Sequence, residues 1–171
     1  VLDDMTADDN VDGRVRFERR LFDEAFESTP VDIVICRHVI EHVADPVRVL
    51  RLAKKVLRPG GRAFFETPCV EWSLTNRVLW DFFYEHCSYF TANSLAMAFA
   101  RAGIAVESVR HVFGGQYLWL EARAAEAAPA WPGDDGRVAA LAAAFGREEP
   151  SRVAALRHEI QRLSVHGRVA M

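Results

Sequence analysis

Several features that would assign a class at once are missing from this sequence. It holds three cysteines, Cys36, Cys69 and Cys87, which are far apart and form no CxxC pair. A dispersed, odd number of thiols excludes a disulfide framework and a zinc ribbon, and it is typical of the reducing cytoplasm. No run of about 18 uncharged apolar residues occurs, and the start carries no signal-peptide pattern, so we expect a cytoplasmic protein with no membrane partner.

An excess of positive charge is missing as well. Lys and Arg number 21 against 24 Asp and Glu, which gives a net charge of −3. A nucleic-acid partner is therefore not expected, because it would need a basic surface. What the 171 residues do contain is apolar material, since half of them are hydrophobic. That is enough to bury the core of about one domain.

A strand, a helix and a second strand follow one another with short loops between them. Val31–Cys36 is a β-branched run typical of a strand buried on both faces. Asp45-Pro46 supplies the N-cap and first-turn proline of a helix that continues to residue 57. Arg58-Pro59-Gly60-Gly61 ends this helix in a turn, and residues 63–67 form the next strand. This order predicts a right-handed βαβ unit in a parallel α/β sheet.

A further helix and a hairpin come next. Thr91 is placed to cap a helix over residues 92–102, and Gly103 to end it. Residues 104–112 and 116–121 have strand character and are joined by a glycine turn. They predict an antiparallel hairpin at the edge of the sheet, with residues 116–121 as an edge strand.

The C-terminal part differs in composition. Residues 123–136 are rich in Ala, Pro, Gly and Asp, which is typical of a linker, and residues 137–163 predict one or two amphipathic helices. Residues 166–171 begin like a strand. We therefore divide the chain into a partial core over residues 1–125 and, over 126–171, a linker and helical segment leading toward a second domain.

Two stretches carry a resemblance to a known family. The run from Val31 to Pro46 resembles the fourth-strand region of class I S-adenosylmethionine-dependent methyltransferases. Residues 56–62, Val-Leu-Arg-Pro-Gly-Gly-Arg, resemble that family's LxPGG turn before strand five, and the hairpin corresponds to its strands six and seven in reversed order. The resemblance covers residues 14–122. It implies an α/β, Rossmann-like fold, of which the chain holds the C-terminal part of the core, followed by a helical extension.

A narrower resemblance concerns the acceptor. Residues 83–90, Phe-Tyr-Glu-His-Cys-Ser-Tyr-Phe, and residues 113–117, Phe-Gly-Gly-Gln-Tyr, are similar to stretches of the sugar C-methyltransferases of deoxysugar biosynthesis. In those proteins a second domain opens with a GRVA-like strand, as at residues 167–170. The resemblance implies an internal slice of a larger enzyme that moves a methyl group from S-adenosylmethionine to a small molecule. A nucleotide-linked deoxysugar is the first choice of acceptor and another secondary metabolite the second.

The sequence departs from the family at its start. The family's glycine-rich cofactor loop is missing, since no GxG occurs, and one short strand signal, around Val15 and Phe17, precedes Val31. A sheet that lacks the family's first strands and their helices exposes an edge and an apolar face. We therefore expect weak or no binding of S-adenosylmethionine unless a second copy or another segment completes the sheet. The alternative to an enzyme is a catalytically incomplete fragment or interaction module.

The predicted catalytic residues are His86, Glu85 and Tyr84. Methylation of a carbon beside a carbonyl needs a base, which suits His86, and Glu85 would orient that imidazole or raise its basicity. Tyr84 would hydrogen-bond a sugar oxygen, although the family tyrosine falls one position earlier, where this chain has Phe83. The competing interpretation of these residues is aromatic packing.

The predicted cofactor-binding residues are Leu21, Phe22, Cys36, Arg37 and His38. Arg37 and His38 follow the carboxyl end of a strand, where ligands bind in open α/β sheets. The resemblance places Leu21 and Phe22 near adenine, with core packing as the alternative. Cys36 ends the same strand, where the alternative to a cofactor contact is a buried small hydrophobe.

Glu41 and His42 are predicted to line the substrate cleft, and the alternative is a structural loop pair. Residues 38–42, His-Val-Ile-Glu-His, also match the HxxEH pattern of inverted zinc proteases. That pattern needs a helix with both histidines on one face, and the short stretch between the strand and Asp45 disfavours one. We therefore expect no metal here.

Overall fold

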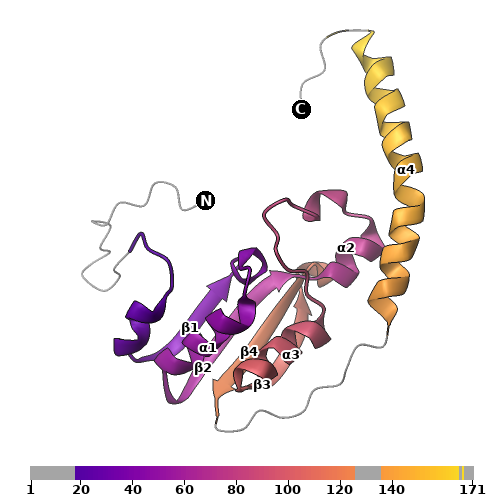
Figure 1. The fold of residues 1–171 in the computed structure, drawn as a ribbon. Helices are drawn as coiled ribbons and strands as arrows, with labels where there is room; N and C mark the ends of the chain where they lie inside the picture. The colour runs from indigo at the N-terminus through magenta and orange to yellow at the C-terminus, as the bar shows by residue number, and fades with distance from the viewer. Residues whose placement is uncertain (1–17, 126–135, 166, 168–171) are drawn as a thin grey trace.

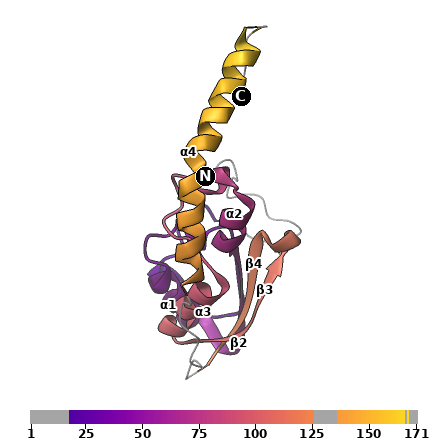
Figure 2. The same ribbon diagram turned by 90° about the vertical axis from the view of Figure 1, so that its right-hand side faces the viewer.

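A four-stranded sheet forms the centre of the computed structural model, which describes residues 18–125, 136–165 and 167. The strands lie in the order β1-β2-β4-β3, and their bounds are Val31–Arg37 (β1), Leu57–Pro68 (β2), Ile104–Val112 (β3) and Tyr117–Ala124 (β4). The helices α1 and α3 lie on one side of this sheet (Figures 1 and 2). The predicted strand around Val15, all of the predicted strand over residues 166–171 except residue 167, and most of the predicted linker lie outside the described residues.

The predicted βαβ unit is confirmed. β1 and β2 are parallel, with Val34 opposite Ala63, and the helix α1, Pro46–Val56, connects them. Asp45 caps this helix, because its Oδ1 accepts a hydrogen bond of 3.0 Å from the backbone N–H of Arg48. Parallel strands beside each other bring their carboxyl ends to one edge of the sheet.

Residues 58–61, where the sequence predicts a turn, belong to β2 instead. The strand begins at Leu57, and its register with β1 shifts between the pairs Val31–Leu57 and Ile33–Arg62. Gly60 has a φ of 79°, a conformation that glycine adopts without a steric penalty. The glycine pair therefore forms an irregularity at the start of β2, and the sheet pairing resumes after it.

The hairpin of β3 and β4 is antiparallel, as predicted, and β3 lies at the sheet edge. The assignment of residues 116–121 to an edge strand is wrong, because β4 lies between β2 and β3. Its residues Leu118, Leu120 and Ala122 are fully buried, as an apolar strand inside the sheet requires. The fold thus reverses the chain order of the last two strands.

The core lies between the sheet and the helices α1 and α3. The helix α3, Ala92–Ala102, begins at Thr91 with a capping box and ends at Gly103, as predicted. Phe65 of β2 and Phe99 of α3 meet edge to face, with ring centroids 5.0 Å apart, and both are buried. This contact joins the sheet to its helical layer.

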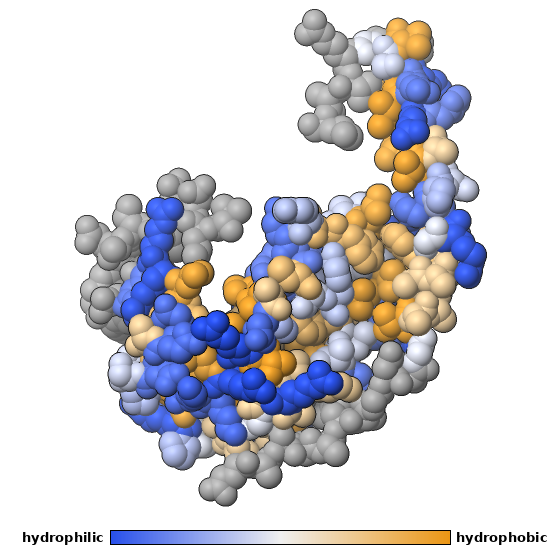
Figure 3. Space-filling model, viewed as in Figure 1, coloured by the Kyte–Doolittle hydropathy of each residue, from blue (hydrophilic) through white to orange (hydrophobic). Residues whose placement is uncertain are grey.

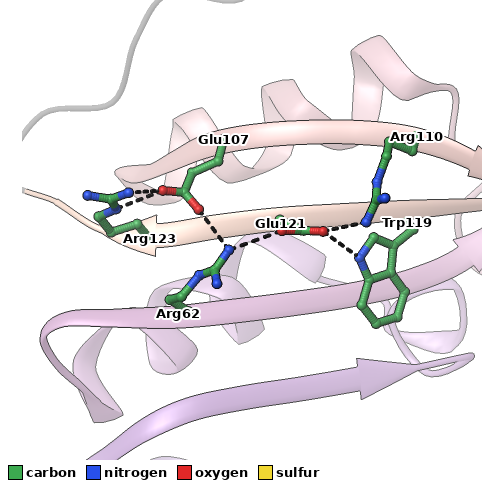
Figure 4. A network of polar contacts seen from close by, with 6 residues as sticks. All are labelled: Arg62, Glu107, Arg110, Trp119, Glu121 and Arg123. Carbon is green, nitrogen blue, oxygen red and sulfur yellow. Dashed lines mark hydrogen bonds and ion pairs between the residues drawn. The ribbon is translucent and has the colours of Figure 1, made fainter.

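The other face of the sheet has two different halves. Over β2, β3 and β4, six side chains form a network of ion pairs and hydrogen bonds (Figure 4): Arg62, Glu107, Arg110, Trp119, Glu121 and Arg123. Beside β1 the surface is apolar, and Ile33 and Ile35 are 54% and 64% exposed. The expectation that β1 is buried on both faces is therefore wrong. In the part of the chain that the structure describes, no strand pairs with its outer edge.

A second group of helices lies beyond the carboxyl ends of the strands. The short helix α2, Val70–Asn76, contacts the long helix α4, Arg137–Ser164, which runs without interruption through Pro150. The far half of α4 projects from the body (Figures 1 and 2). Across the described ranges no helix has the length and apolar character needed to cross a bilayer.

Candidate functional site

The carboxyl ends of β1 and β2 hold two buried carboxylates. Glu41 is 2% exposed and Glu66 is 3% exposed. Glu66 belongs to β2, and Glu41 lies in the single 3-10 turn Ile40–His42 that follows β1. Ligands bind at this edge of open α/β sheets, and buried carboxylates need charged or hydrogen-bonding partners.

Glu66 takes its partners from the end of β1. Its Oε1 accepts from Nη2 of Arg37 at 2.9 Å and from Nε of the same guanidinium at 3.1 Å. Nε2 of His38 lies 2.9 Å from this oxygen, and the backbone N–H of His38 donates to the carbonyl of Glu66. His38 reaches this position with a left-handed φ of 52°. The two predicted cofactor residues therefore bind a carboxylate that the sequence analysis did not single out.

Glu41 is held from the other side by β2. The hydroxyl of Thr67, itself fully buried, donates to Oε2 of Glu41 at 2.9 Å. The second carboxylate oxygen, Oε1, lies 3.7 Å from Nδ1 of His38 and 4.0 Å from Nε2 of His42. Both distances exceed a hydrogen bond, so this oxygen faces two imidazole nitrogens across a gap.

The segment that contains the predicted catalytic residues is hydrogen-bonded to the same turn. The backbone N–H groups of Cys87 and Ser88 donate to the carbonyl of Glu41 at 2.8 and 3.0 Å. Nδ1 of His42 donates to the carbonyl of Glu85 at 3.2 Å. Segments some 40 residues apart in the chain are thus joined by three hydrogen bonds, which bring His86 to the cluster.

His86 is half-buried among aromatic rings. Its ring centroid lies 4.7 Å from that of His42, 5.2 Å from Phe83 and 5.8 Å from Tyr89, each in an edge-to-face arrangement. Burial raises the pKa of Tyr89 above its ordinary value, so this phenol stays protonated at neutral pH. The packing orients the imidazole of His86 while leaving part of it open to solvent.

The other two predicted catalytic residues lie differently. Tyr84 is 99% exposed, so packing does not hold its ring. Glu85 contributes its backbone carbonyl, which binds His42, and no contact joins its carboxylate to His86 among the described residues. The ring of His42, and not the carboxylate of Glu85, therefore contacts His86.

A hollow of about 630 Å³ runs along the free side of β1. Phe22 and Cys36 line it, together with Ile33, Ile35 and Phe26, while Leu21 is largely exposed and lies outside it. Burial, and then the charge of Glu41, raise the pKa of the Cys36 thiol to about 12. Apolar surface is visible at the bottom of a hollowed part on the left of the space-filling view (Figure 3). Of the predicted cofactor residues, Phe22, Cys36 and Arg37 thus line this hollow, Arg37 and His38 bind Glu66, and Leu21 does neither.

Three members of the site escaped the sequence analysis. Glu66 and Thr67 end an otherwise apolar predicted strand, and a charged residue in such a strand was the available signal. Tyr117 packs edge-on against His38 with ring centroids 4.7 Å apart, and no local pattern indicated this contact.

Residues 38–42 do not form the helix that the HxxEH pattern requires. His38 has a left-handed φ, and the turn after it contains three residues. His38 and His42 nevertheless approach the same oxygen of Glu41, while Nε2 of His38 binds Glu66. The histidines converge through the tertiary structure and not along one helix face.

Comparison with known sequences gives consistent results. The model of a methyltransferase-domain family matches residues 4–109. The ubiquinone biosynthesis O-methyltransferase of Aeromonas salmonicida is 38% identical over 55 residues, 31% of this chain and 23% of that protein. Its counterpart in Aliivibrio fischeri is 47% identical over 36 residues, 21% of this chain and 15% of that protein. The chain spans less than a quarter of the length of these relatives.

Solved structures resemble the chain in fold. An O-methyltransferase family protein from Burkholderia thailandensis gives a TM-score of 0.53 at 23% identity, over 66% of this chain and 36% of that one. A chain of the complex between the Haloferax volcanii Trm112 methyltransferase activator and its proposed methyltransferase gives 0.50 at 15% identity, over 56% and 54%. At these identities the likeness establishes a Rossmann-like fold and no more.

Proposed function

This chain belongs to the methyltransferase-domain family, and we propose that it transfers the methyl group of S-adenosylmethionine to a small molecule. The observation that carries the proposal is the cluster of polar side chains at the carboxyl ends of the parallel strands β1 and β2. Ligands bind at this edge in open α/β sheets. The cluster contains imidazoles that can accept protons and a guanidinium that can bind an anionic or polar group.

The residues beside β1 fit one wall of a cofactor site. The hollow of about 630 Å³ has the size of a small-molecule pocket. Phe22 would lie near the adenine, Cys36 would line the same hollow, and Arg37 and His38 would lie at the carboxyl end of the strand. When bound, S-adenosylmethionine supplies an electrophilic methyl group on a sulfonium. The chain's own residues then have to hold the acceptor in line with that group and remove its proton.

His86 is the proposed general base. Its ring is half-exposed and oriented by His42, Phe83 and Tyr89, so an acceptor can reach the imidazole while the ring stays in place. His86 would take a proton from a carbon beside a carbonyl group, and the electron pair left on that carbon would form the bond to the methyl group while the methyl–sulfur bond of the sulfonium breaks and its electron pair stays on the departing thioether. His42 acts as a positioning residue, because its own ring is held by the carbonyl of Glu85.

A nucleotide-linked keto-deoxysugar is the acceptor we propose first. Residues 83–90 support a carbon acceptor, because they resemble a stretch of the sugar C-methyltransferases and contain His86, which can serve as the base that carbon methylation needs. Oxygen methylation of another secondary metabolite is the second choice, and the names of the curated relatives support it. The two differ in the proton that is removed, which makes them separable by experiment.

Proton exchange tests this proposal. The chain is incubated in D₂O with S-adenosylmethionine, labelled in its methyl group, and a nucleotide-linked keto-deoxysugar. We expect deuterium at the carbon beside the carbonyl and label in the product, and we expect His86→Gln to lose both. His111→Gln, an exposed histidine of β3, is the matched control and should keep both. Exchange that survives in folded His86→Gln would remove this residue from the mechanism.

A second candidate function follows from the uncovered side of β1. Exposed Ile33 and Ile35 favour a chain that acts only after a second copy or another segment completes its sheet. In that case S-adenosylmethionine would bind weakly to the chain alone. Calorimetric titration with S-adenosylmethionine separates the two: a dissociation constant of about 1 mM or weaker supports the incomplete module, and tight binding supports the enzyme.

A further inference from the structure

We propose that Glu41, His42 and His86 bind a divalent transition-metal ion, with Zn²⁺ the best match to the ligand set. The carboxylate oxygen and the two imidazole nitrogens that these residues offer all lie within 4.8 Å of one another. The site stands on this geometry alone and does not depend on methyl transfer. Two imidazoles and one carboxylate form a set that zinc uses with a fourth position left for water or substrate.

The hydrogen bond of His42 determines which of its nitrogens can bind a metal. Nδ1 lies 3.2 Å from the carbonyl oxygen of Glu85, and a carbonyl oxygen can only accept. Nδ1 therefore carries the hydrogen, and in the neutral ring Nε2 carries the lone pair. Nε2 is the nitrogen that faces Glu41, at 4.0 Å from its Oε1. Metal-binding histidines are commonly fixed in this way, with the other ring nitrogen donating to a carbonyl.

The carboxylate of Glu41 is fixed in a complementary way. Thr67 donates to Oε2 and thereby directs Oε1 toward the imidazoles. Oε1 and Nε2 of His42 are then two acceptors facing each other across 4.0 Å, with no donor between them in the described contacts. Two zinc bonds of about 2.1 Å put ligand atoms about 3.4 Å apart in a tetrahedral site. A shift of some tenths of an ångström in a half-exposed side chain closes the difference.

A third ligand comes from a distant part of the chain and is held in place by the backbone. Cys87 and Ser88 both donate to the carbonyl of Glu41, so the residue before them, His86, stays beside His42 at a ring separation of 4.7 Å. The cluster is therefore organised before any ion binds. Glu41 is buried, His86 is half-buried and His42 is exposed, which leaves one side open for entry of the ion.

A second cluster of similar composition provides a contrast. Cys69, Glu71 and His111 also bring three ligand atoms within 4.8 Å. Burial raises the pKa of the Cys69 thiol, which disfavours the thiolate that binds metal, and Glu71 is paired with Arg137 at 3.7 Å. This cluster lacks an ionised ligand that is not already paired. It therefore serves as the internal control.

Metal binding and proton transfer compete for His86. A neutral imidazole has one lone pair, so His86 cannot hold an ion and accept a proton at the same time. A bound ion would therefore suppress the base role proposed above. The metal proposal is tested by a binding measurement. A negative result there would leave the methyl-transfer proposal standing.

The experiment is a titration of the full chain with Co²⁺, followed by visible absorption and then by displacement with Zn²⁺. We expect saturation at one ion per chain. His42→Ala and His86→Ala should each weaken the affinity about tenfold or more, because removal of a ligand costs at least as much as removal of its supporting partner. Glu41→Gln, which keeps a hydrogen bond to Thr67, should weaken it as well. Circular dichroism verifies that each variant is folded.

His111→Ala is the matched control and should bind Co²⁺ as the parent chain does. The proposal is overturned if the parent chain shows no saturable binding. It is equally overturned if folded His42→Ala and His86→Ala bind as tightly as the parent chain, or if His111→Ala alone weakens the affinity.

Discussion

Nε2 of His38 lies 2.9 Å from Oε1 of Glu66, which joins the residue that follows β1 to a buried carboxylate in β2. Arg37 donates to the same oxygen at 2.9 Å. A carboxylate that is 3% exposed needs such partners, because desolvation of an unpaired charge is costly. The chain thus uses two of its predicted ligand-binding residues as partners of a buried carboxylate, and Arg37 supplies the balancing charge.

Glu66→Gln should destabilise the fold. The amide keeps the shape but removes the charge that balances Arg37, so we expect the free energy of unfolding to fall by about 1–3 kcal/mol. Asp32→Asn is the matched control, because Asp32 is 75% exposed and its ion pair with Arg58 is screened by water. Urea unfolding, followed by circular dichroism, measures both. Equal losses in the two variants would contradict the role assigned to burial.

Thr91→Ala should weaken the start of α3. Thr91 Oγ1 accepts from the backbone N–H of Ser94 at 3.0 Å, and Ser94 Oγ accepts from the backbone N–H of Thr91 at 2.9 Å. Loss of such a cap costs about 1 kcal/mol. Thermal and urea unfolding measure the loss. Thr75→Ala, the same change at an exposed position of α2, should stay within about 0.5 kcal/mol of the parent chain.

The three cysteines should differ in reactivity. At pH 8 Cys36 stays a thiol, because burial and the charge of Glu41 raise its pKa to about 12, and burial also raises the pKa of Cys69. Cys87 is exposed. We expect iodoacetamide to modify Cys87 first, as read by peptide mass spectrometry, and all three cysteines in urea. Modification of Cys36 in the folded chain at the rate of Cys87 would contradict this order.

The same shift has a consequence in alkali. The folded-state pKa of Cys36 lies above its ordinary value of 9.0, so the unfolded chain loses this proton first as the pH rises. The contribution of Cys36 to the free energy of unfolding is therefore complete below pH 9 and declines between pH 9 and about 12. Cys36→Ala should reduce this part of the pH dependence, measured by urea unfolding across that range.

The exposed side of β1 should bind an apolar dye. Ile33 and Ile35 lie beside the hollow of about 630 Å³, and contiguous apolar surface binds anilinonaphthalene sulfonate. We expect Ile33→Ser with Ile35→Ser to lower the dye fluorescence while the free energy of unfolding changes little. Leu156→Ser, the equivalent change on exposed α4, should lower it less, because an isolated helix offers no hollow. Equal decreases would contradict a site at β1.

Local patterns were sufficient for α1, α3 and the βαβ unit, whereas they did not indicate the short helix α2. Asp45 and Thr91 cap their helices as expected because a cap is a contact with a backbone N–H three residues away. The β-branched run over residues 31–36 and its apolar counterpart over 63–67 pair in parallel, since the helix between them permits that crossover. His86 could also be named in advance, from its motif.

The rest depends on contacts that no local pattern encodes. The reversed order of β3 and β4 was implied by the family resemblance and not by a local pattern, and the exposure of β1 depends on which strands meet. The cluster around Glu41 joins residues from β2, from the turn after β1 and from the segment before α3, through hydrogen bonds between positions far apart in the chain. Residue types and spacing therefore identified a methyltransferase-like chain and singled out His86 as a candidate base. Which carboxylates, carbonyls and rings surround that histidine was decided by long-range packing, because each distance depends on several elements at once.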